Sequence, residues 1–518
     1  MGVAMMELPF FAIACVVSFI MGQPVDGFSG SFQLLIFAGS LLYVITAFFY
    51  LRRLLKYFFD DWIVAIILLT LALGTNIYFF SVYEGTMAHA YLFFLYSLLF
   101  YGTVKWYEGS KRGWAFTIGI CCGLITLIRP NEIISVLIPI LYGISYFGSF
   151  RGWIDFVTRH WQIHAATVCM FIAVGLPQLI YWKMLTGNFF FYSYGNEGFD
   201  FIHPKILNGI FSFNNGWLVY TPVMFFAIIG LLFIPQQNHF RIAIPVYLII
   251  YVYVIYSYLW WDYYNGFGSR PMVETYPALA LPLGYLFHRI SKISIARVGA
   301  VIVFAFFILL NLFQVWQYHH GILWTSIGTR SSYAYLFGKT SMTTKALVLY
   351  DTNEPQPSHV SYVKTIPASL IGDSIFQRGI TETSDSVFLI QRHEEEFTNL
   401  IKVSGSDLSS MKGNYLKISV EARNDNYQFD LWRMTALIVS IDGSVSPLLW
   451  KAVRIQNESG SDHPGLWNCT VGDWYHFDYF ICVPANLPND AKLQMYLWNQ
   501  CKCNQIAIRN FNIEVWKE

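Results

Sequence analysis

Residues 31–51 read SFQLLIFAGSLLYVITAFFYL, an apolar stretch without a charged residue. A helix rises about 1.5 Å per residue, so this stretch would span about 30 Å, the thickness of a bilayer's hydrocarbon core. Further apolar stretches of similar length follow before residue 317, and the rest of the chain contains none. The sequence therefore predicts a multi-pass α-helical membrane protein with about eleven spans. They cover residues 7–22, 31–51, 62–81, 88–104, 113–128, 133–149, 165–182, 217–234, 242–260, 272–287 and 297–316.

The composition supports this class and excludes others. Hydrophobic residues make up 55% of the chain and charged residues 13%, and the mean hydropathy is +0.44. These values are typical of a protein that lies largely in lipid, and they exclude a soluble enzyme. The formal net charge of +1 implies no nucleic-acid partner.

Lys and Arg are concentrated in alternate loops of the predicted membrane part. One set of loops holds Arg52, Arg53, Lys56, Lys105, Lys111, Arg112, Arg151, Arg159, Arg241, Arg289, Lys292 and Arg297, and the other holds Arg129, Lys183, Lys205 and Arg270. Because cytoplasmic loops carry an excess of basic residues, the first set is predicted to be cytoplasmic. Residues after 316 then lie outside, and so do the polar loops with unusual chemistry. This topology requires segment 133–149 to cross the membrane completely.

The domain organisation follows from a change of periodicity. We predict a membrane domain at 1–316, a connector at 317–349 and a β domain at 350–518. Short alternating strands separated by turn residues favour an all-β sandwich. They are predicted at 359–365, 387–391, 415–422, 435–441, 474–483, 493–498 and 506–515. The segments GDWY at 472–475 and LQMYLWN at 493–499 resemble jelly-roll domains related to carbohydrate-binding modules. The alternative is a cap that shields a membrane site without binding sugar.

Eight cysteines divide evenly between the two parts. Those in the apolar spans are expected to be small buried hydrophobes. Cys469, Cys482, Cys501 and Cys503 could pair in an oxidising compartment, with three connectivities open. Cys501 and Cys503 are expected to be poorly spaced for a bridge to each other.

Charged residues at the outer membrane margin are candidates for function, because a charge near a helix centre costs about 2.5–3.5 kcal/mol on insertion scales. The alternative for each is an ordinary loop charge at the water boundary. The set comprises Asp26, Glu84, His89, Arg129, Glu132, Asp262, Arg270 and Glu274.

Several stretches resemble the bacterial GT-C glycosyltransferase superfamily, near its protein O-mannosyltransferase and lipid A aminoarabinose transferase branch. They are YEGTMAHAYLFFLY at 83–96, GLITLIRPN at 123–131, YWKMLTGNFFFYSY at 181–194, FSFNNGWLVYTP at 211–222 and GFGSRP at 266–271. The resemblance implies a GT-C-like membrane fold and a transferase that moves a sugar from a polyprenyl-phosphate donor to a glycan, lipid or protein acceptor. It also implies a bacterial inner membrane, contact with membrane lipids, and an extracytoplasmic (periplasmic) C-terminal domain.

Such a transfer needs cations for the phosphate leaving group, because guanidinium stays charged and grips phosphate oxygens in a fork. Arg129 and Arg270 are the natural partners, and Lys183 is a third. Arg129 could instead cap a helix end or pair with Glu132. Substrate contacts are assigned to Asn131, Glu132, Tyr194 and Asp262.

The transfer also needs a base for the acceptor hydroxyl. The resembled family commonly has an acid where this chain has His89, with Glu84 five residues earlier. His89 could orient substrate, share a divalent metal site with Glu84, or bond a neighbouring helix. No cofactor is assigned with certainty, and a divalent metal is the one that stays open. Asp26 is the remaining catalytic candidate, in a PVDG segment that equally favours a turn.

The chain departs from the resembled family at its start. Its first span resembles the family's third, so the segment with the principal catalytic acid is missing, and we expect either a truncated sequence or a degenerate form. Two other function classes stay open. One is a transporter or flippase of lipid-linked glycan. The sequence argues against it, because it has no clear internal repeat and no charged residue in the middle of a span. The other is a non-catalytic glycan-binding scaffold.

Overall fold

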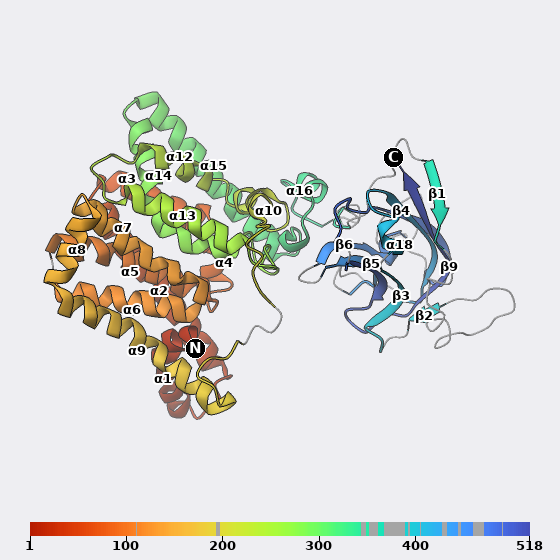
Figure 1. The fold of residues 1–518 in the computed structure, drawn as a ribbon, viewed down its shortest axis with the longest axis horizontal. Helices are drawn as coiled ribbons and strands as arrows, with labels where there is room; N and C mark the ends of the chain where they lie inside the picture. Colours follow the sequence, from red (N-terminus) through yellow and green to blue (C-terminus); the bar gives the residue numbers. More distant parts are fainter. Residues whose placement is uncertain are drawn as a thin grey trace. The chain divides into compact units, whose positions relative to one another are not determined.

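The computed structural model describes residues 1–109, 111–192, 197–342, 346, 349–351, 361–366, 389–391, 394–404, 406–426, 433–443, 447–458, 471–488 and 490–517. The chain divides into two compact units, Met1–Ile327 and Gly328–Glu518. The first unit is helical, and the second is built mainly of β-strands (Figure 1). Each is described by itself below.

The first unit begins with long apolar helices and continues with shorter ones between turns. Its α-helices are α1 (Gly2–Ile20), α2 (Gly30–Leu55), α3 (Asp61–Gly74), α4 (Ile77–Val82), α5 (Ala88–Gly109), α6 (Arg112–Ile128), α7 (Leu137–Tyr146), α8 (Phe150–Arg159), α9 (Trp161–Thr186), α10 (Ile206–Phe211), α11 (Trp217–Tyr220), α12 (Met224–Gly230), α13 (Phe240–Tyr256), α14 (Tyr276–Ser291) and α15 (Ser294–His319). Its 3-10 helices are η1 (Pro130–Val136), η2 (Leu231–Phe233), η3 (Arg270–Thr275) and η4 (Thr325–Ile327).

Helix α5 lies at the centre of this unit. It packs against α2 on one side and α6 on another, and α6 in turn packs against α9 (Figure 1). Most α5 side chains are buried, including Tyr91 and Tyr96. Because α5 is apolar around most of its circumference, it is buried rather than presented to solvent. Its first turn therefore places His89 inside the bundle.

Four helices of the described residues are long and apolar enough to cross a membrane, namely α1, α2, α9 and α15. The count rises to five if η1 and α7 form one broken span with α8. Every predicted span contains helix, but several are interrupted: α3 ends at Gly74 and α4 begins at Ile77. The chain is thus a helical membrane protein with a C-terminal β region. The number of about eleven membrane crossings stays a prediction.

The predicted complete crossing at 133–149 has a bent path. Segment Pro130–Tyr146 and segment Phe150–Arg159 meet at 106°. Gly148 adopts φ 69° between them, a left-handed conformation that glycine reaches without strain. The side chain of Ser149 then accepts a hydrogen bond from Gly152 N and caps α8.

The second unit begins with α16 (Arg330–Leu336) and contains two antiparallel sheets. One has the order β1-β9-β4-β7, with β2 also paired to β9, and the other has the order β3-β8-β5-β6. The strands are β1 (Ser361–Thr365), β2 (Leu389–Gln391), β3 (Phe397–Ser404), β4 (Tyr415–Asn424), β5 (Ala436–Asp442), β6 (Pro447–Arg454), β7 (Tyr475–Cys482), β8 (Lys492–Trp498) and β9 (Ile506–Lys517). A single apolar cluster draws Ile418, Val439, Met495 and Ile513 from both sheets, as in a sandwich.

The predicted strands agree with the observed ones in the described residues, apart from their ends. The prediction at 435–441 is confirmed as Ala436–Asp442, and that at 506–515 as Ile506–Lys517. The first residues of the predicted strands at 359–365 and 387–391 lie outside the described residues. Strands β3 and β6 were not predicted. Both are edge strands, and β6 opens with Pro447, a residue that sheets tolerate at edges and strand starts.

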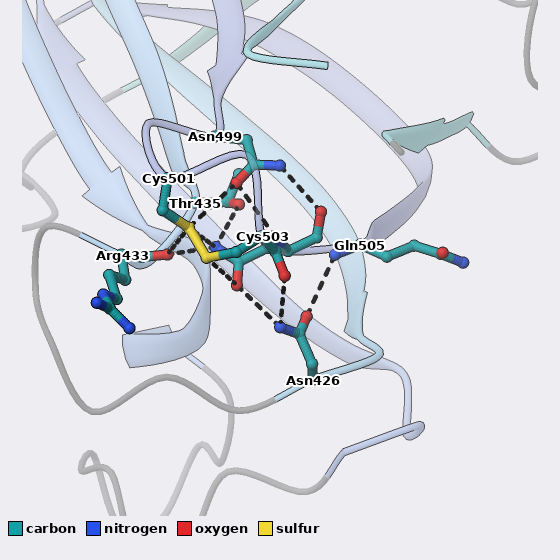
Figure 2. The surroundings of a disulfide bond; sticks show 8 residues. Asn426, Arg433, Thr435, Asn499, Cys501, Cys503 and Gln505 are labelled. Carbon is teal, nitrogen blue, oxygen red and sulfur yellow. Dashed lines mark hydrogen bonds between the residues drawn. A yellow bond between two sulfur atoms is a disulfide. The ribbon is translucent and has the colours of Figure 1, made fainter. Parts of the chain in front are cut away.

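The expectation that Cys501 and Cys503 are poorly spaced for a bridge to each other is wrong. The structure joins them in a disulfide with a Cα–Cα distance of 5.2 Å, which is within the usual range (Figure 2). The reason is local: Lys502 has φ 53°, so the chain reverses between the two cysteines and brings their sulfurs together. Cys482 is the last residue of β7. Cys469 lies outside the described residues.

Candidate functional site

The candidate site is built on two Arg–Pro turns. Arg129 ends α6, and Pro130 opens η1; Arg270 and Pro271 open η3. Proline suits the first turn of a helix because it has no N–H to leave unpaired. Each turn thus fixes the backbone immediately beside a guanidinium group.

His89 and Glu274 join Arg129 in a buried network. His89 Nδ1 lies 2.9 Å from Glu274 Oε1, and Arg129 Nη2 lies 3.2 Å from His89 Nε2. Arg129 Nη1 also lies 3.4 Å from Glu274 Oε1. Since Arg129 can only donate, His89 Nε2 accepts, and the ring hydrogen is on Nδ1 facing the carboxylate. His89 is therefore neutral, and the Arg129 charge is paired with Glu274.

Arg270 has no such partner. Its Nε is buried without a hydrogen bond, and no ion pair to Arg270 occurs among the described residues. The guanidinium carbon lies 5.8 Å from the centre of the Tyr263 ring, a cation–π contact. A half-buried guanidinium without a carboxylate is costly unless it meets an anion. The site thus contains one cation in an ion pair and one without an ion pair among the described residues.

Glu132 lies beside this network in a cage of tyrosines. It is fully buried, and its Oε2 accepts a hydrogen bond of 2.6 Å from the Tyr96 hydroxyl. The Tyr251 hydroxyl lies 3.1 Å from Glu132 Oε1. The Arg129–Glu132 ion pair considered from the sequence is replaced by the Arg129–Glu274 pair. The physical reason is that η1 turns the Glu132 side chain into the bundle toward α5 and α13.

Asp262 lies in the loop that leads to Arg270. Its Oδ2 accepts a hydrogen bond of 3.0 Å from Asn214 Nδ2. Burial raises the pKa of this carboxyl group above its usual value, although the Asn214 hydrogen bond and the Arg270 charge lower it. The next two residues, Tyr263 and Tyr264, have φ of 55° and 49°. Consecutive non-glycine residues in this conformation are strained, and such strain is found at functional sites.

Other predicted residues are placed elsewhere or make no contact with the network. Asp26 is exposed, and its Oδ1 accepts hydrogen bonds from Phe28 N and Ser29 N at 2.8 and 2.9 Å. These bonds lower its pKa and give it the role of a turn former. Lys183 is also exposed and donates to Gly187 O, 2.6 Å away. Glu84 and Asn131 are partly buried, and Tyr194 lies outside the described residues.

The network also contains residues that we did not assign to the site. Glu274 belonged to the outward charged set, but nothing in the sequence linked it to His89, 185 positions away. Tyr251 was one of many aromatics near an outer boundary, and its hydroxyl contacts both Glu132 and Pro271. The hydroxyl group of Tyr251, within an otherwise apolar segment, was the only feature of the sequence that could have pointed to this role.

The proposed metal site at Glu84 and His89 is not favoured by the geometry. Both ring nitrogens of His89 already have protein partners. The Nδ1 hydrogen faces Glu274 and the Nε2 lone pair faces Arg129, so no lone pair is left to bind a metal. No group of three or more metal-ligating side chains occurs in the part of the chain that the structure describes. The chemistry available here is anion binding and hydrogen bonding.

No protein-family model and no curated protein matches this chain. Among solved structures, it is similar to the arabinosyltransferase EmbB from Mycobacterium smegmatis, with a TM-score of 0.31 and 9% sequence identity. The alignment covers 93% of this chain and 58% of the EmbB chain, so this chain spans little more than half the length of that protein. A similarity at this TM-score carries no functional argument, and the proposals below depend on the residues themselves.

Proposed function

We propose that the chain is a membrane glycosyltransferase of the GT-C type that transfers a sugar from a polyprenyl-phosphate donor to an acceptor on the outer face of a bacterial inner membrane. The observation that carries this proposal is the Arg270 guanidinium, which has no ion pair among the described residues, beside the paired Arg129. A phosphate headgroup would supply the missing negative charge. The β domain would then be periplasmic, as the loop charges predict.

In this mechanism Arg270 binds the phosphate and stabilises the negative charge that develops as the sugar departs. Burial, and after it the charge of Arg129, lowers the pKa of Arg270, so the two guanidinium groups act on the same region. Asp262 is the acid best suited to take the acceptor's proton, because it is shielded, held by Asn214 and electrostatically coupled to Arg270. Asp26 lacks this environment, since it is exposed and serves a turn.

Arg270→Ala tests the proposal. Lipids that co-purify with the wild-type protein are identified by mass spectrometry, and transfer from that lipid is then measured with both proteins in proteoliposomes. We expect the variant to lose the bound polyprenyl phosphate and to transfer sugar about a hundredfold more slowly, the usual cost of removing one charge-stabilising donor. Lys183→Ala is the matched control and retains both. Wild-type rates in Arg270→Ala, or movement of the intact lipid-linked sugar across the membrane without transfer, would refute it.

A second role, glycan binding by the β domain, is favoured by an aromatic strip on sheet β3-β8-β5-β6. Phe397 and Trp450 are 55% and 44% exposed. The Phe397 and Trp498 rings are nearly parallel with centroids 6.2 Å apart, and the Trp450 and Trp498 centroids are 6.5 Å apart. Gln494 donates to Asp442 at the same sheet and provides polar groups nearby. Flat rings beside hydrogen-bonding groups suit the apolar and polar faces of a sugar.

Trp450→Ala tests this second role. We expect it to weaken retention of the full-length protein on immobilised cell-wall glycan about tenfold, since one buried aromatic contact contributes about 1 kcal/mol or more. Trp474→Ala is the control, because Trp474, just before β7 of the other sheet, is covered by Arg423 and Arg509. If both variants are retained as well as the wild type, the glycan-binding role is refuted, and the alternative that the domain is a cap is favoured.

A further inference from the structure

Tyr251 lies between the two Arg–Pro turns. It belongs to α13, and its hydroxyl oxygen is 2.6 Å from the carbonyl oxygen of Pro271 and 3.1 Å from Glu132 Oε1. Pro271 directly follows Arg270, and Glu132 is the third residue after Arg129. One side chain therefore touches both turns that carry the site's cations.

The number of hydrogens at these three oxygens fixes the direction of the hydrogen bonds. A tyrosine hydroxyl has one hydrogen, and a carbonyl oxygen can only accept. The shorter contact, to Pro271 O, takes that hydrogen. The contact between Tyr251 and Glu132 then needs a hydrogen on Glu132 Oε1, so Glu132 donates as a neutral carboxylic acid while its Oε2 accepts from Tyr96.

The charges around Glu132 support the neutral form. Arg129, the cation nearest in sequence, pairs with Glu274, and no ion pair to Glu132 occurs among the described residues. A fully buried carboxylate without a cation within pairing distance would be very costly. The same carboxyl group in its neutral form has a hydrogen-bond partner at each oxygen.

We propose that Tyr251 is a positioning residue, which together with a neutral Glu132 ties the Arg129 turn to the Arg270 turn so that both guanidinium groups face one phosphate. The chain of bonds runs from Tyr96 through Glu132 and Tyr251 to the backbone beside Arg270. It holds the second cation in place without contacting the ligand. The part of this proposal that concerns the phosphate rests on the proposed function, and the part that concerns the proton on Glu132 does not.

Tyr251→Phe tests the positioning role through binding of farnesyl phosphate to the purified full-length protein. Loss of one hydrogen bond should raise the Kd about fivefold, and the affinity for uncharged farnesol should not change. Tyr253→Phe is the matched control, because Tyr253 also belongs to α13 and its hydroxyl donates to Phe201 O, which belongs to neither Arg–Pro turn. An unchanged Kd in Tyr251→Phe overturns the positioning role. Absence of phosphate-dependent binding in the wild type overturns the proposed function instead.

Glu132→Gln tests the proton without reference to activity. An amide can donate to Tyr251 and accept from Tyr96, so this variant should keep the wild-type Kd, whereas Glu132→Ala should lose affinity as Tyr251→Phe does. The infrared difference spectrum between wild type and Glu132→Gln should contain the carbonyl band of a protonated carboxyl group, shifted in heavy water. If the band is absent, or if Glu132→Gln binds as poorly as Glu132→Ala, Glu132 is charged and the proposal fails.

Discussion

The neutral His89 side chain connects Arg129 to Glu274 at the centre of the site. His89 donates from Nδ1 to Glu274 and accepts at Nε2 from Arg129. Because the ring is rigid and both nitrogens are used, it fixes the separation of the two charged groups. His89 is thus better suited to hold Arg129 in place than to exchange protons with a substrate.

Removal of Glu274 should show how much this network contributes to stability. Glu274→Ala leaves Arg129 without its ion pair and His89 Nδ1 without an acceptor. Breaking a buried charge pair from one side typically costs about 3 kcal/mol or more. We expect a clearly lower midpoint in thermal unfolding of the detergent-solubilised protein. Glu84→Ala, which removes a partly exposed acid, should change it little; an equal loss in both variants would contradict this reasoning.

The residue types at the site could be predicted from the sequence, but their pairing could not. Loop charges and the cost of charge near lipid selected Arg129 and Arg270 as candidates, and their outward orientation stays a prediction. Glu132 was the obvious local partner for Arg129, yet the observed partner is Glu274 from a distant turn. Pairing depends on the direction in which each 3-10 turn points its side chain, and sequence spacing carries no information on that.

At the level of elements, the bend before α8 separates this short helix from the helix before it. The segment leaves the preceding helix at 106°. Trp153 donates to the Tyr107 hydroxyl at 3.1 Å, and Phe156 packs against Trp106. Ile154 remains exposed in the protein, as does Asp155 on a different side. A short amphipathic helix of this kind lies at the boundary between headgroups and acyl chains.

Cysteine accessibility checks this placement. With the protein in nanodiscs, Asp155→Cys should react rapidly with a membrane-impermeant thiol reagent, because its side chain faces water. Ile154→Cys should react at least about tenfold more slowly, because apolar side chains of an interfacial helix are covered by lipid. In detergent-free denaturant both should react alike. Equal rates in the nanodisc would place α8 away from the lipid surface.

Strands with a regular alternation were the easier ones to predict. The strand predicted at 415–422 is β4, paired to β7 and β9, and its alternating burial reproduces the alternating sequence. Strands β3 and β6 have one neighbour each, and β6 exposes Leu448 and Trp450. The edge position alone does not explain the omission, since β1, β2 and β7 also have one neighbour each and were predicted. In β6 the opening Pro447 and the run of apolar residues after it hide the alternation.

Over the whole molecule, polar chemistry is concentrated differently in the two units. The helical unit buries Glu132, Glu274 and His89 near its Arg–Pro turns, whereas the core shared by the two sheets is apolar. Buried ionisable groups are expensive in a membrane protein and are retained where they are used. We therefore expect the proposed transfer chemistry in the helical unit and the proposed glycan contacts on the surface of the β unit.

The Cys501–Cys503 bridge has a consequence for where the chain can mature. It joins residues with a sequence separation of 2, so it removes little entropy from the unfolded chain and adds little to stability. The bridge is also part of a local hydrogen-bond network, since Asn504 donates to the Cys501 sulfur, to Arg433 O and to Thr435 Oγ1. Cytosolic glutathione would keep the two thiols reduced. Exported protein should therefore be lighter by two hydrogen atoms than protein retained in the cell interior.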